Sequence, residues 1–234
     1  MQVLDILDVY RPKKLIFSHL SKYYDLALKV GYMKSMVFLI FSLLFSCAAL
    51  GQVTLRVGDL LLQPLNCWTC NLIEAEEKTI YSHMGLVISV NPLLIAESIG
   101  EVHAIPLAQF AVKTERGQRL AVMRIKDQEA ARKFKLHAAE LWNEFTFFRG
   151  KKFDKRYLWD NVDENGDELY YCSEFITKLL SKFLQMEMPI KRMHYYENRL
   201  EWEKYFDGQV PDGEWGNSPS DYYRSELFEF IGEL

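Results

Sequence analysis

The sequence predicts an α+β fold in which antiparallel strands are followed by helices. Strand-like segments come first along the 234 residues and helix-like segments mostly later, whereas an alternating parallel fold would interleave the two. The composition is 49% hydrophobic and 26% charged, with 12 Gly and 7 Pro, which is typical of an ordinary globular protein. At this length we expect one compact domain.

The predicted strands are apolar runs bounded by turn residues. The segments 84–90 and 93–99 flank a turn at Asn91 and Pro92, so they are predicted to form an antiparallel hairpin. Further strands are predicted at 60–62, 102–106 and 120–125.

Two amphipathic helices are predicted after the strands. Asp127 caps the first, whose apolar side chains recur at helical spacing as far as Phe145, and Gly150 closes it. The second begins at Cys172 and carries an apolar stripe to Phe183. The segment 66–79 is predicted as a loop or a helical turn. The last 50 residues are aromatic and loop-rich and give no clear assignment.

The N-terminus is typical of a targeting sequence. Residues 36–50 form an apolar run of 15, shorter than the roughly 18 to 20 residues of a membrane-spanning helix. Ala49 and Gly51 supply the small residues of a cleavage site before Gln52. We therefore expect export to the periplasm or cell envelope, with Met33 as the true start. On this interpretation residues 1–51 comprise an N-terminal extension and a signal peptide, 52–234 form the domain, and no stable membrane span remains after processing.

Two alternatives remain for the same segment. An uncut apolar helix would anchor the chain in the membrane. Cys47 would instead serve as a lipid-attachment residue after Leu44, Phe45 and Ser46.

The charge of the chain argues against nucleic acid as a partner, and the spacing of its cysteines argues against a zinc site. The net charge is −4 and no run of five Lys or Arg occurs, so nucleic acid is not an expected partner. Cys67 and Cys70 form a lone C-x-x-C without a second pair or a nearby His, so a local disulfide or two ordinary thiols is favoured over a zinc site. We expect no metal and no cofactor.

Cys172, His83 and Glu97 are the candidate catalytic residues. Cys172 lies where a polar loop gives way to a helix, and the free N–H groups and helix dipole there favour a reactive thiolate. His83 directly precedes a buried strand and could act as the base. Glu97 is acidic within an apolar strand, where an unpaired charge is costly. The structural alternatives are an inert core cysteine, a structural histidine and a solvated glutamate on the outer face of the hairpin.

The hairpin register brings two of these residues together. With the turn near Asn91, residue 83 lies opposite residue 99, and Glu97 is its diagonal neighbour on the same face. A slip of one residue would move Glu97 to the other face. If Glu97 does not orient the imidazole, His103 in the following strand is the nearest other candidate.

Four segments resemble a known family: YSHMGLVI around His83, AES around Glu97, GKKFD ending at Asp154, and YYCSEFITKLL around Cys172. They are similar to the permuted papain-like NlpC/P60 cysteine hydrolases of the YiiX and YaeF type. The resemblance extends from about Val57 to the NSPSD segment at 217–221. In that family the histidine strand precedes the cysteine helix.

The resemblance implies a small antiparallel sheet, or half-barrel, packed against helices. It also implies Cys172 as nucleophile, His83 as base and Glu97 as the residue that orients the imidazole. The implied activity is that of a cysteine peptidase or amidase, with cell-wall peptide as a plausible substrate. Asp154 matches a family position, but a loop-capping role is the favoured explanation.

Two other functions remain open. The related lecithin retinol acyltransferase group has a similar order of His and Cys, so acyl transfer or thioester hydrolysis on lipid substrates is an alternative. Glu97 stands where that group typically has a His, which favours the hydrolases. The third possibility is a peptide- or lipid-binding module that performs no turnover.

Overall fold

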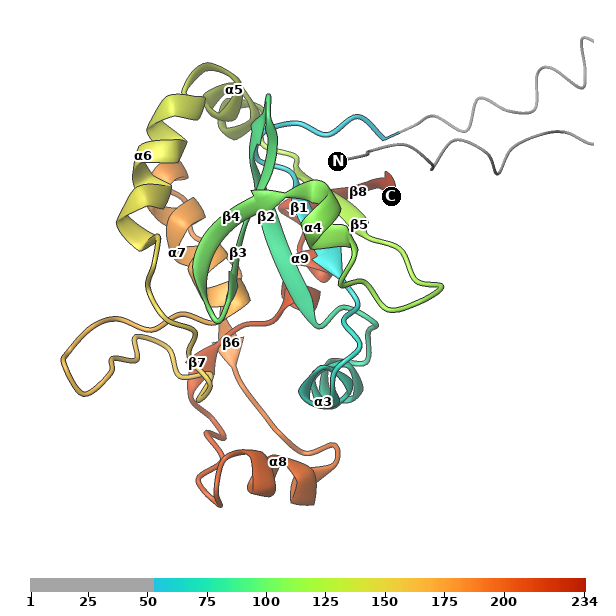
Figure 1. Cartoon of the computed structure of the whole chain (residues 1–234), viewed down its shortest axis with the longest axis vertical. Helices are drawn as coiled ribbons and strands as arrows, with labels where there is room; N and C mark the ends of the chain where they lie inside the picture. The colour runs from blue at the N-terminus through green and yellow to red at the C-terminus, as the bar shows by residue number, and fades with distance from the viewer. Residues whose placement is uncertain (1–52) are drawn as a thin grey trace, which may run out of the picture. The chain divides into compact units, whose positions relative to one another are not determined.

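A computed structural model describes residues 53–234, and its centre is one antiparallel sheet of six strands (Figure 1). The strand order is β4-β3-β2-β1-β5-β8, so strands that follow each other in the chain mostly lie side by side. The strands are β1 (Leu60–Gln63), β2 (His83–Val90), β3 (Leu93–Ile99), β4 (Glu101–Pro106), β5 (Ala121–Ile125) and β8 (Phe228–Glu233). All five strands predicted from the sequence are present, which confirms the antiparallel hairpin and the α+β fold.

The helices lie between and around these strands. They are α3 (Trp68–Glu77), α4 (Leu107–Ala111), α5 (Gln128–Leu136), α6 (Ala138–Phe148), α7 (Cys172–Leu184), α8 (Arg199–Tyr205) and α9 (Pro219–Arg224). Two short strands, β6 (Lys191–Arg192) and β7 (Trp215–Gly216), precede and follow α8 in the chain and pair with each other. The segment predicted as a loop or helical turn at 66–79 contains a helix of 10 residues, and the sulfur of its N-terminal cap Cys67 accepts the Cys70 N–H.

The two faces of the sheet are covered by different elements. On one face Leu60, Leu62 and Met84 pack against α5, α6 and α7 in the larger hydrophobic core. Alternate residues such as Leu61 and Val87 face the other side, where Phe110 of α4 covers them. This alternation follows from the two-residue period of a strand.

The structure corrects the predicted helix from Asp127 to Phe145. Asp127 caps α5 as predicted, because its Oδ1 accepts the Ala130 N–H at 2.8 Å. The chain leaves helical geometry at His137, which ends α5 and precedes α6. The break lets Phe134 pack near Gly58 while Phe145 packs on α7. In a single straight helix the apolar side chains would all face one direction, so Phe134 and Phe145 could not reach these two different partners.

A small aromatic core lies apart from the main one. Leu72 of α3 and Met193, Tyr195, Trp202 and Phe206 form a separate cluster of buried side chains. Helices α3 and α8 lie together at the bottom of the molecule in Figure 1. This cluster occupies the C-terminal region that gave no assignment from the sequence.

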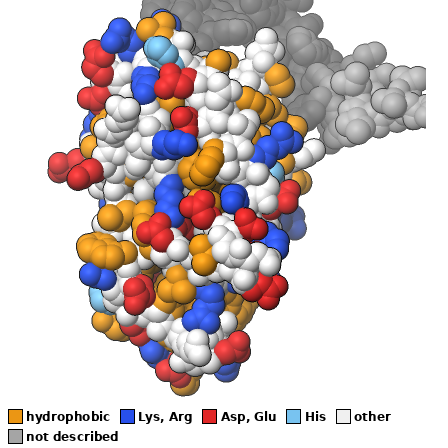
Figure 2. All heavy atoms as spheres, turned by 90° about the vertical axis from the view of Figure 1, so that its left-hand side faces the viewer, with side chains coloured by type: hydrophobic (Ala, Val, Ile, Leu, Met, Phe, Trp, Pro, Cys, Tyr) orange, Lys and Arg blue, Asp and Glu red, His pale blue; other side chains and the backbone are white. Residues whose placement is uncertain are grey.

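Residues 53–234 form one compact unit. On the face seen in Figure 2, Lys and Arg side chains are interspersed with Asp and Glu, without a continuous positive area. No helix in this part of the chain is long and apolar enough to cross a membrane. The predicted start at Met33, the apolar run, Cys47 and the cleavage after Gly51 lie outside the described residues.

Candidate active site

His83 is the first residue of β2, where the strand enters the sheet. It is paired with Gln63 of β1, and the adjoining Ser82 N–H donates to the Gln63 carbonyl at 3.2 Å. The side chain is buried, with 2% of the residue exposed. The imidazole therefore projects from a backbone that is fixed by the sheet.

Gly85 explains the glycine of the SHMG segment. A Cβ at this position would lie 2.8 Å from the Phe110 ring and 2.5 Å from Ile95. Because glycine has no side chain, Phe110 can approach the strand and pack with its ring 5.7 Å from that of His83. The glycine therefore permits the packing of α4 against the imidazole.

Glu97 lies in β3 and contacts His83 directly. Its Oε2 is 2.7 Å from His83 Nε2, and the residue is fully buried. Leu86 pairs with Ala96 in the adjoining ladder, as the predicted register requires, although a bulge near Ser89 shifts the pairs closer to the turn. The carboxylate is therefore on the same face as the imidazole, and the solvated alternative for Glu97 is excluded.

Cys172 is the first residue of α7 and is 7% exposed. The start of this helix is tied to the strand that carries Glu97, because the Ser98 hydroxyl donates to the Tyr170 carbonyl at 2.7 Å. Adjacent residues of β3 thus serve two purposes: Glu97 holds the imidazole on one face, and Ser98 holds the helix start on the other. The Cys172 thiol lies close enough to His83 to influence the pKa of the imidazole.

The charges of the three groups are coupled. Burial alone lowers the pKa of His83, but the hydrogen bonds and negative charges of Cys172 and Glu97 outweigh burial and raise this pKa to about 9. Burial alone raises the pKa of Glu97, but His83 and Lys113 outweigh it and lower this pKa to about 2. At neutral pH the arrangement therefore favours an imidazolium held between two acidic partners.

A small pocket of about 40 Å³ opens beside the thiol. Its lining is mostly aromatic and apolar and comes from α3, α8 and the segments around 193–195 and 217–219, and it includes Ile73, Tyr157, Met193, Tyr195, Trp202 and Asn217. These residues were not among the sequence-predicted site residues, except that Asn217 begins the NSPSD segment. Apart from Asn217, none of them belongs to a motif of the sequence, and none is a chain neighbour of Cys172.

Tyr157 reaches the pocket from a tightly held loop. Its φ is +51°, a left-handed conformation that bulky residues rarely adopt. Asp154 holds the surrounding backbone, because its carboxylate accepts the N–H groups of Arg156 and Leu158, both at 2.8 Å, and the Asn161 amide at 2.9 Å. These bonds confirm the predicted loop-capping role of Asp154.

Glu174 secures the same loop from the helix. Its Oε1 accepts the Asp160 N–H at 3.0 Å and pairs with Lys178 at 2.8 Å. Burial raises the pKa of Glu174 to about 7, although Lys178 and the Asp160 N–H act in the opposite direction. The helix of the thiol and the loop of Tyr157 are therefore joined by a buried carboxyl group.

The remaining cysteines form a disulfide between Cys67 and Cys70 at the start of α3. Of the alternatives that the sequence left open, the local disulfide is confirmed. Within residues 53–234, Cys172 is the free cysteine. The same part of the chain contains no group of three or more His, Cys, Asp or Glu side chains arranged to hold a metal ion.

A thiol at a helix start, facing an imidazole that a carboxylate holds on an antiparallel sheet, defines the class of papain-like cysteine hydrolases. A family model described as permuted papain-like amidase enzyme, YaeF/YiiX, C92 family, matches residues 54–225. The chain belongs to this family, and it is an enzyme of the cysteine peptidase or amidase type.

A solved structure shows the same fold. The chain is similar to a protein described as metalloprotein yiiX from Escherichia coli O157:H7, with 20% sequence identity and a TM-score of 0.65. The match covers 76% of this chain and 97% of the other. A search of curated proteins gives no match.

Proposed function

We propose that this protein is an exported cysteine amidase that cleaves an amide bond in cell-wall peptide with Cys172, His83 and Glu97. The observation that carries the proposal is the buried His83 imidazole, which is hydrogen-bonded to Glu97 and lies close enough to the Cys172 thiol for the two groups to influence each other. Because Nε2 of the imidazole faces Glu97, Nδ1 is the nitrogen left for the thiol. The carboxylate thereby fixes both the tautomer and the ring orientation.

The first half of the reaction forms a thioester. The Cys172 thiolate attacks the amide carbonyl, and backbone N–H groups at the start of α7 stabilise the oxyanion of the tetrahedral intermediate. His83 donates its proton to the leaving nitrogen as the C–N bond breaks. The amine departs and the acyl group stays on the sulfur.

The second half restores the enzyme. Neutral His83 takes a proton from water, the resulting hydroxide attacks the thioester, and the C–S bond breaks to regenerate the thiolate beside the imidazolium. The products are a carboxylic acid and an amine. Nucleic acid takes no part in this reaction.

The test is product analysis on two kinds of substrate. We expect the purified protein to release fragments from peptidoglycan with one new amine and one new carboxyl group, observed by mass spectrometry. Cys172→Ala should abolish the release while its melting temperature stays near that of the wild type. Intact peptidoglycan together with turnover of acyl lipids would contradict the proposal and favour the acyltransferase alternative.

One observation is the reason for testing acyl lipids as well as peptidoglycan. The pocket beside Cys172 is mostly apolar and aromatic, which suits an acyl chain as well as an apolar part of a peptide. An acyltransferase would pass the acyl group from the thioester to an alcohol or amine rather than to water. Binding of either substrate without turnover would indicate a binding module.

We also propose that the chain is exported and cut after Gly51, which rests on the short apolar run and the small residues before Gln52. N-terminal sequencing of protein from the cell envelope should begin at Gln52. An intact chain in the membrane fraction would instead indicate an anchor, and a lipid on Cys47 would indicate lipid attachment.

A further inference from the structure

The carboxylate of Glu97 has two partners outside the proposed triad. Its Oε2 faces His83, while its Oε1 is 2.5 Å from Lys113 Nζ and 3.1 Å from His103 Nε2. Glu97 is fully buried, whereas the side chains of Lys113 and His103 are 31% and 29% exposed. The two residues thus reach the buried carboxylate from the surface.

His103 reaches Glu97 across the sheet. It lies in β4 directly opposite Glu97 of β3, so the strand register fixes its approach. His103 is hydrogen-bonded to Glu97 and not to His83. It therefore does not replace Glu97 as the residue that orients the imidazole.

Lys113 reaches Glu97 from the loop after α4, and this loop is anchored to the strand beside His83. Gln63 of β1 donates to the Phe110 carbonyl at 2.7 Å and to the Thr114 hydroxyl at 2.9 Å, on both sides of Lys113. Gln63 is also the pairing partner of His83. The backbone of Lys113 is therefore tied to the same point of the sheet as the imidazole.

We propose that Lys113 is a positioning residue that acts on the proposed triad through Glu97: its ammonium group compensates the buried charge of the carboxylate that accepts the His83 N–H. This inference rests on the proposed function. One imidazolium cannot balance both the thiolate and the carboxylate, and an uncompensated charge in an apolar interior is costly. With Lys113 the charges alternate along Cys172, His83, Glu97 and Lys113.

The proposal makes a prediction about the titration of His83. The titratable groups that face it are Cys172 from α7 and Glu97 from β3, with His103 and Lys113 behind Glu97. Glu74 of α3 reaches only the neighbouring Ser82. Loss of the Lys113 charge removes a cation that opposes the imidazolium, so His83 should keep its proton to higher pH.

The experiment measures the alkylation rate of Cys172 by iodoacetamide against pH in the full chain, with peptide mapping to separate Cys172 from Cys47. In the wild type we expect a step in the rate where His83 loses its proton, and His83→Asn should remove that step. Lys113→Met should move the step upward by about one pH unit, because Lys113 acts from behind Glu97 rather than in direct contact. Lys113→Arg should restore it.

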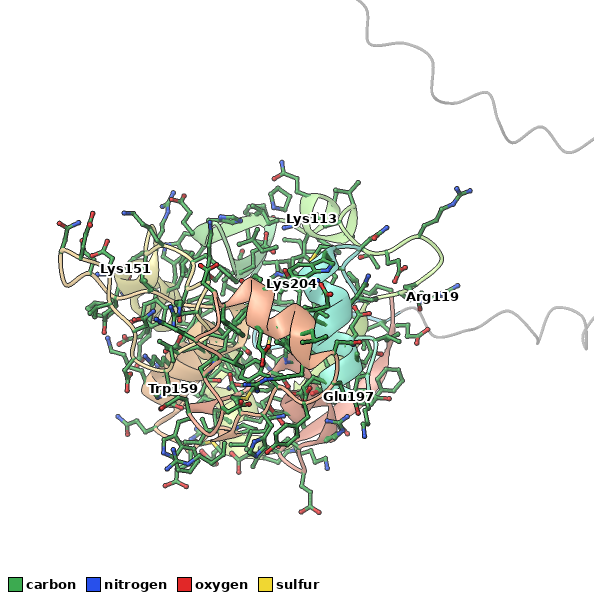
Figure 3. The ribbon with its side chains drawn as sticks, turned by 90° about the horizontal axis from the view of Figure 1, so that it is seen from below. Lys113, Arg119, Lys151, Trp159, Glu197 and Lys204 are labelled. Carbon is green, nitrogen blue, oxygen red and sulfur yellow. A yellow bond between two sulfur atoms is a disulfide. The ribbon has the colours of Figure 1, made fainter. Side chains whose placement is uncertain are left out.

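Arg119→Met is the matched control, because Arg119 lies elsewhere on the loop that carries Lys113 and loses the same charge (Figure 3). In Arg119→Met the step in the alkylation rate should occur at the same pH as in the wild type. If Lys113→Met does not fold, Lys113→Gln removes the same charge and answers the question. A step that stays in place in a folded neutral variant overturns the proposal and leaves Lys113 a structural role. A profile that His83→Asn leaves unchanged would overturn the proposed function itself, and this inference with it.

Discussion

Two regions beside Cys172 are built on different principles. The wall formed by β2 and β3, here the sheet wall, carries His83 and Glu97, and both oxygens of Glu97 are hydrogen-bonded. The pocket beside Cys172 has the second wall, here the aromatic wall, which comprises Tyr157, Tyr195 and Trp202. Among the described residues, the Tyr195 hydroxyl and the Trp202 indole N–H are buried without a hydrogen-bond partner.

This difference separates chemistry from binding. A catalytic imidazole must be held in one orientation, and a fully bonded carboxylate on a rigid sheet provides this. A binding surface instead gains from large side chains with unused hydrogen-bonding capacity, since a ligand can supply the missing partner. We therefore expect changes in the sheet wall to alter kcat and changes in the aromatic wall to alter KM.

The largest effect is expected in the sheet wall at Glu97. Glu97→Ala leaves the imidazole without an acceptor and should lower kcat by about 10²-fold or more. Glu97→Gln still offers a side-chain oxygen to His83 but loses the charge, so its kcat should fall less than that of Glu97→Ala, and less than that of Cys172→Ala. Steady-state kinetics of the three variants give the comparison, with thermal melts to show that each is folded.

The KM values of the Glu97 variants show whether Glu97 acts on catalysis alone, as expected for the sheet wall. They should stay close to that of the wild type, because Glu97 does not line the pocket. Wild-type kinetics in Glu97→Ala would exclude the orienting role.

A smaller effect is expected in the aromatic wall at Trp202. Truncating this buried ring to alanine removes about 3–5 kcal/mol of packing, and the loss is confined to the cluster around α8. KM should rise by about tenfold, the equivalent of roughly 1.4 kcal/mol, while kcat changes little. Trp202→Phe should recover most of the affinity. Hydrogen exchange of α8 amides reports the local loosening.

Trp215→Ala is the control, because Trp215 is 44% exposed and lies outside both the cluster and the pocket lining. It should leave both kinetic constants unchanged. If Trp202→Ala lowered kcat at an unaltered KM, the division between a catalytic and a binding wall would not hold.

The two walls also differ in how far the sequence could predict them. The sheet wall follows from short-range patterns: apolar runs set β2 and β3, and the turn at Asn91 sets the register that brings Glu97 to His83. The contact between Glu97 and His103 was available in the same way, because a hairpin turned at Gly100 places residue 103 opposite residue 97. The fold class and the helix of Cys172 were predictable for the same reason.

The aromatic wall had no such pattern. Helix α8 has seven residues, too few to show a helical period, and Trp202 contacts α3 through packing between segments more than a hundred residues apart. Tyr157 lies in an irregular loop whose shape depends on Asp154 and Glu174. Long-range packing of this kind is set by the whole fold, whereas periodicity reports only local structure.

A third effect is a dependence of stability on pH, which distinguishes the sheet wall from the helix α7. The pKa of His83 is raised from an ordinary 6.5 to about 9, so the folded state binds this proton more tightly than the unfolded chain. The resulting stabilisation is complete below pH 6.5 and is lost as the pH rises towards 9. The loss should be about 1–3 kcal/mol, since one pKa unit corresponds to about 1.4 kcal/mol.

Glu174 of α7 gives a second pH range in which stability falls, and this range can be measured separately from that of His83. Its pKa is raised from 4.5 to about 7, so its neutral form favours folding and the associated stability is lost between about pH 4.5 and 7. Melting temperatures measured from pH 4.5 to 9.5 should therefore fall in two stages. Glu174→Gln should flatten the lower stage alone, and His83→Asn the upper stage alone. If His83→Asn left the decline above pH 7 intact, the imidazolium would not be a stabilising part of the sheet wall, and the charge coupling from Lys113 to Cys172 would lose its central member.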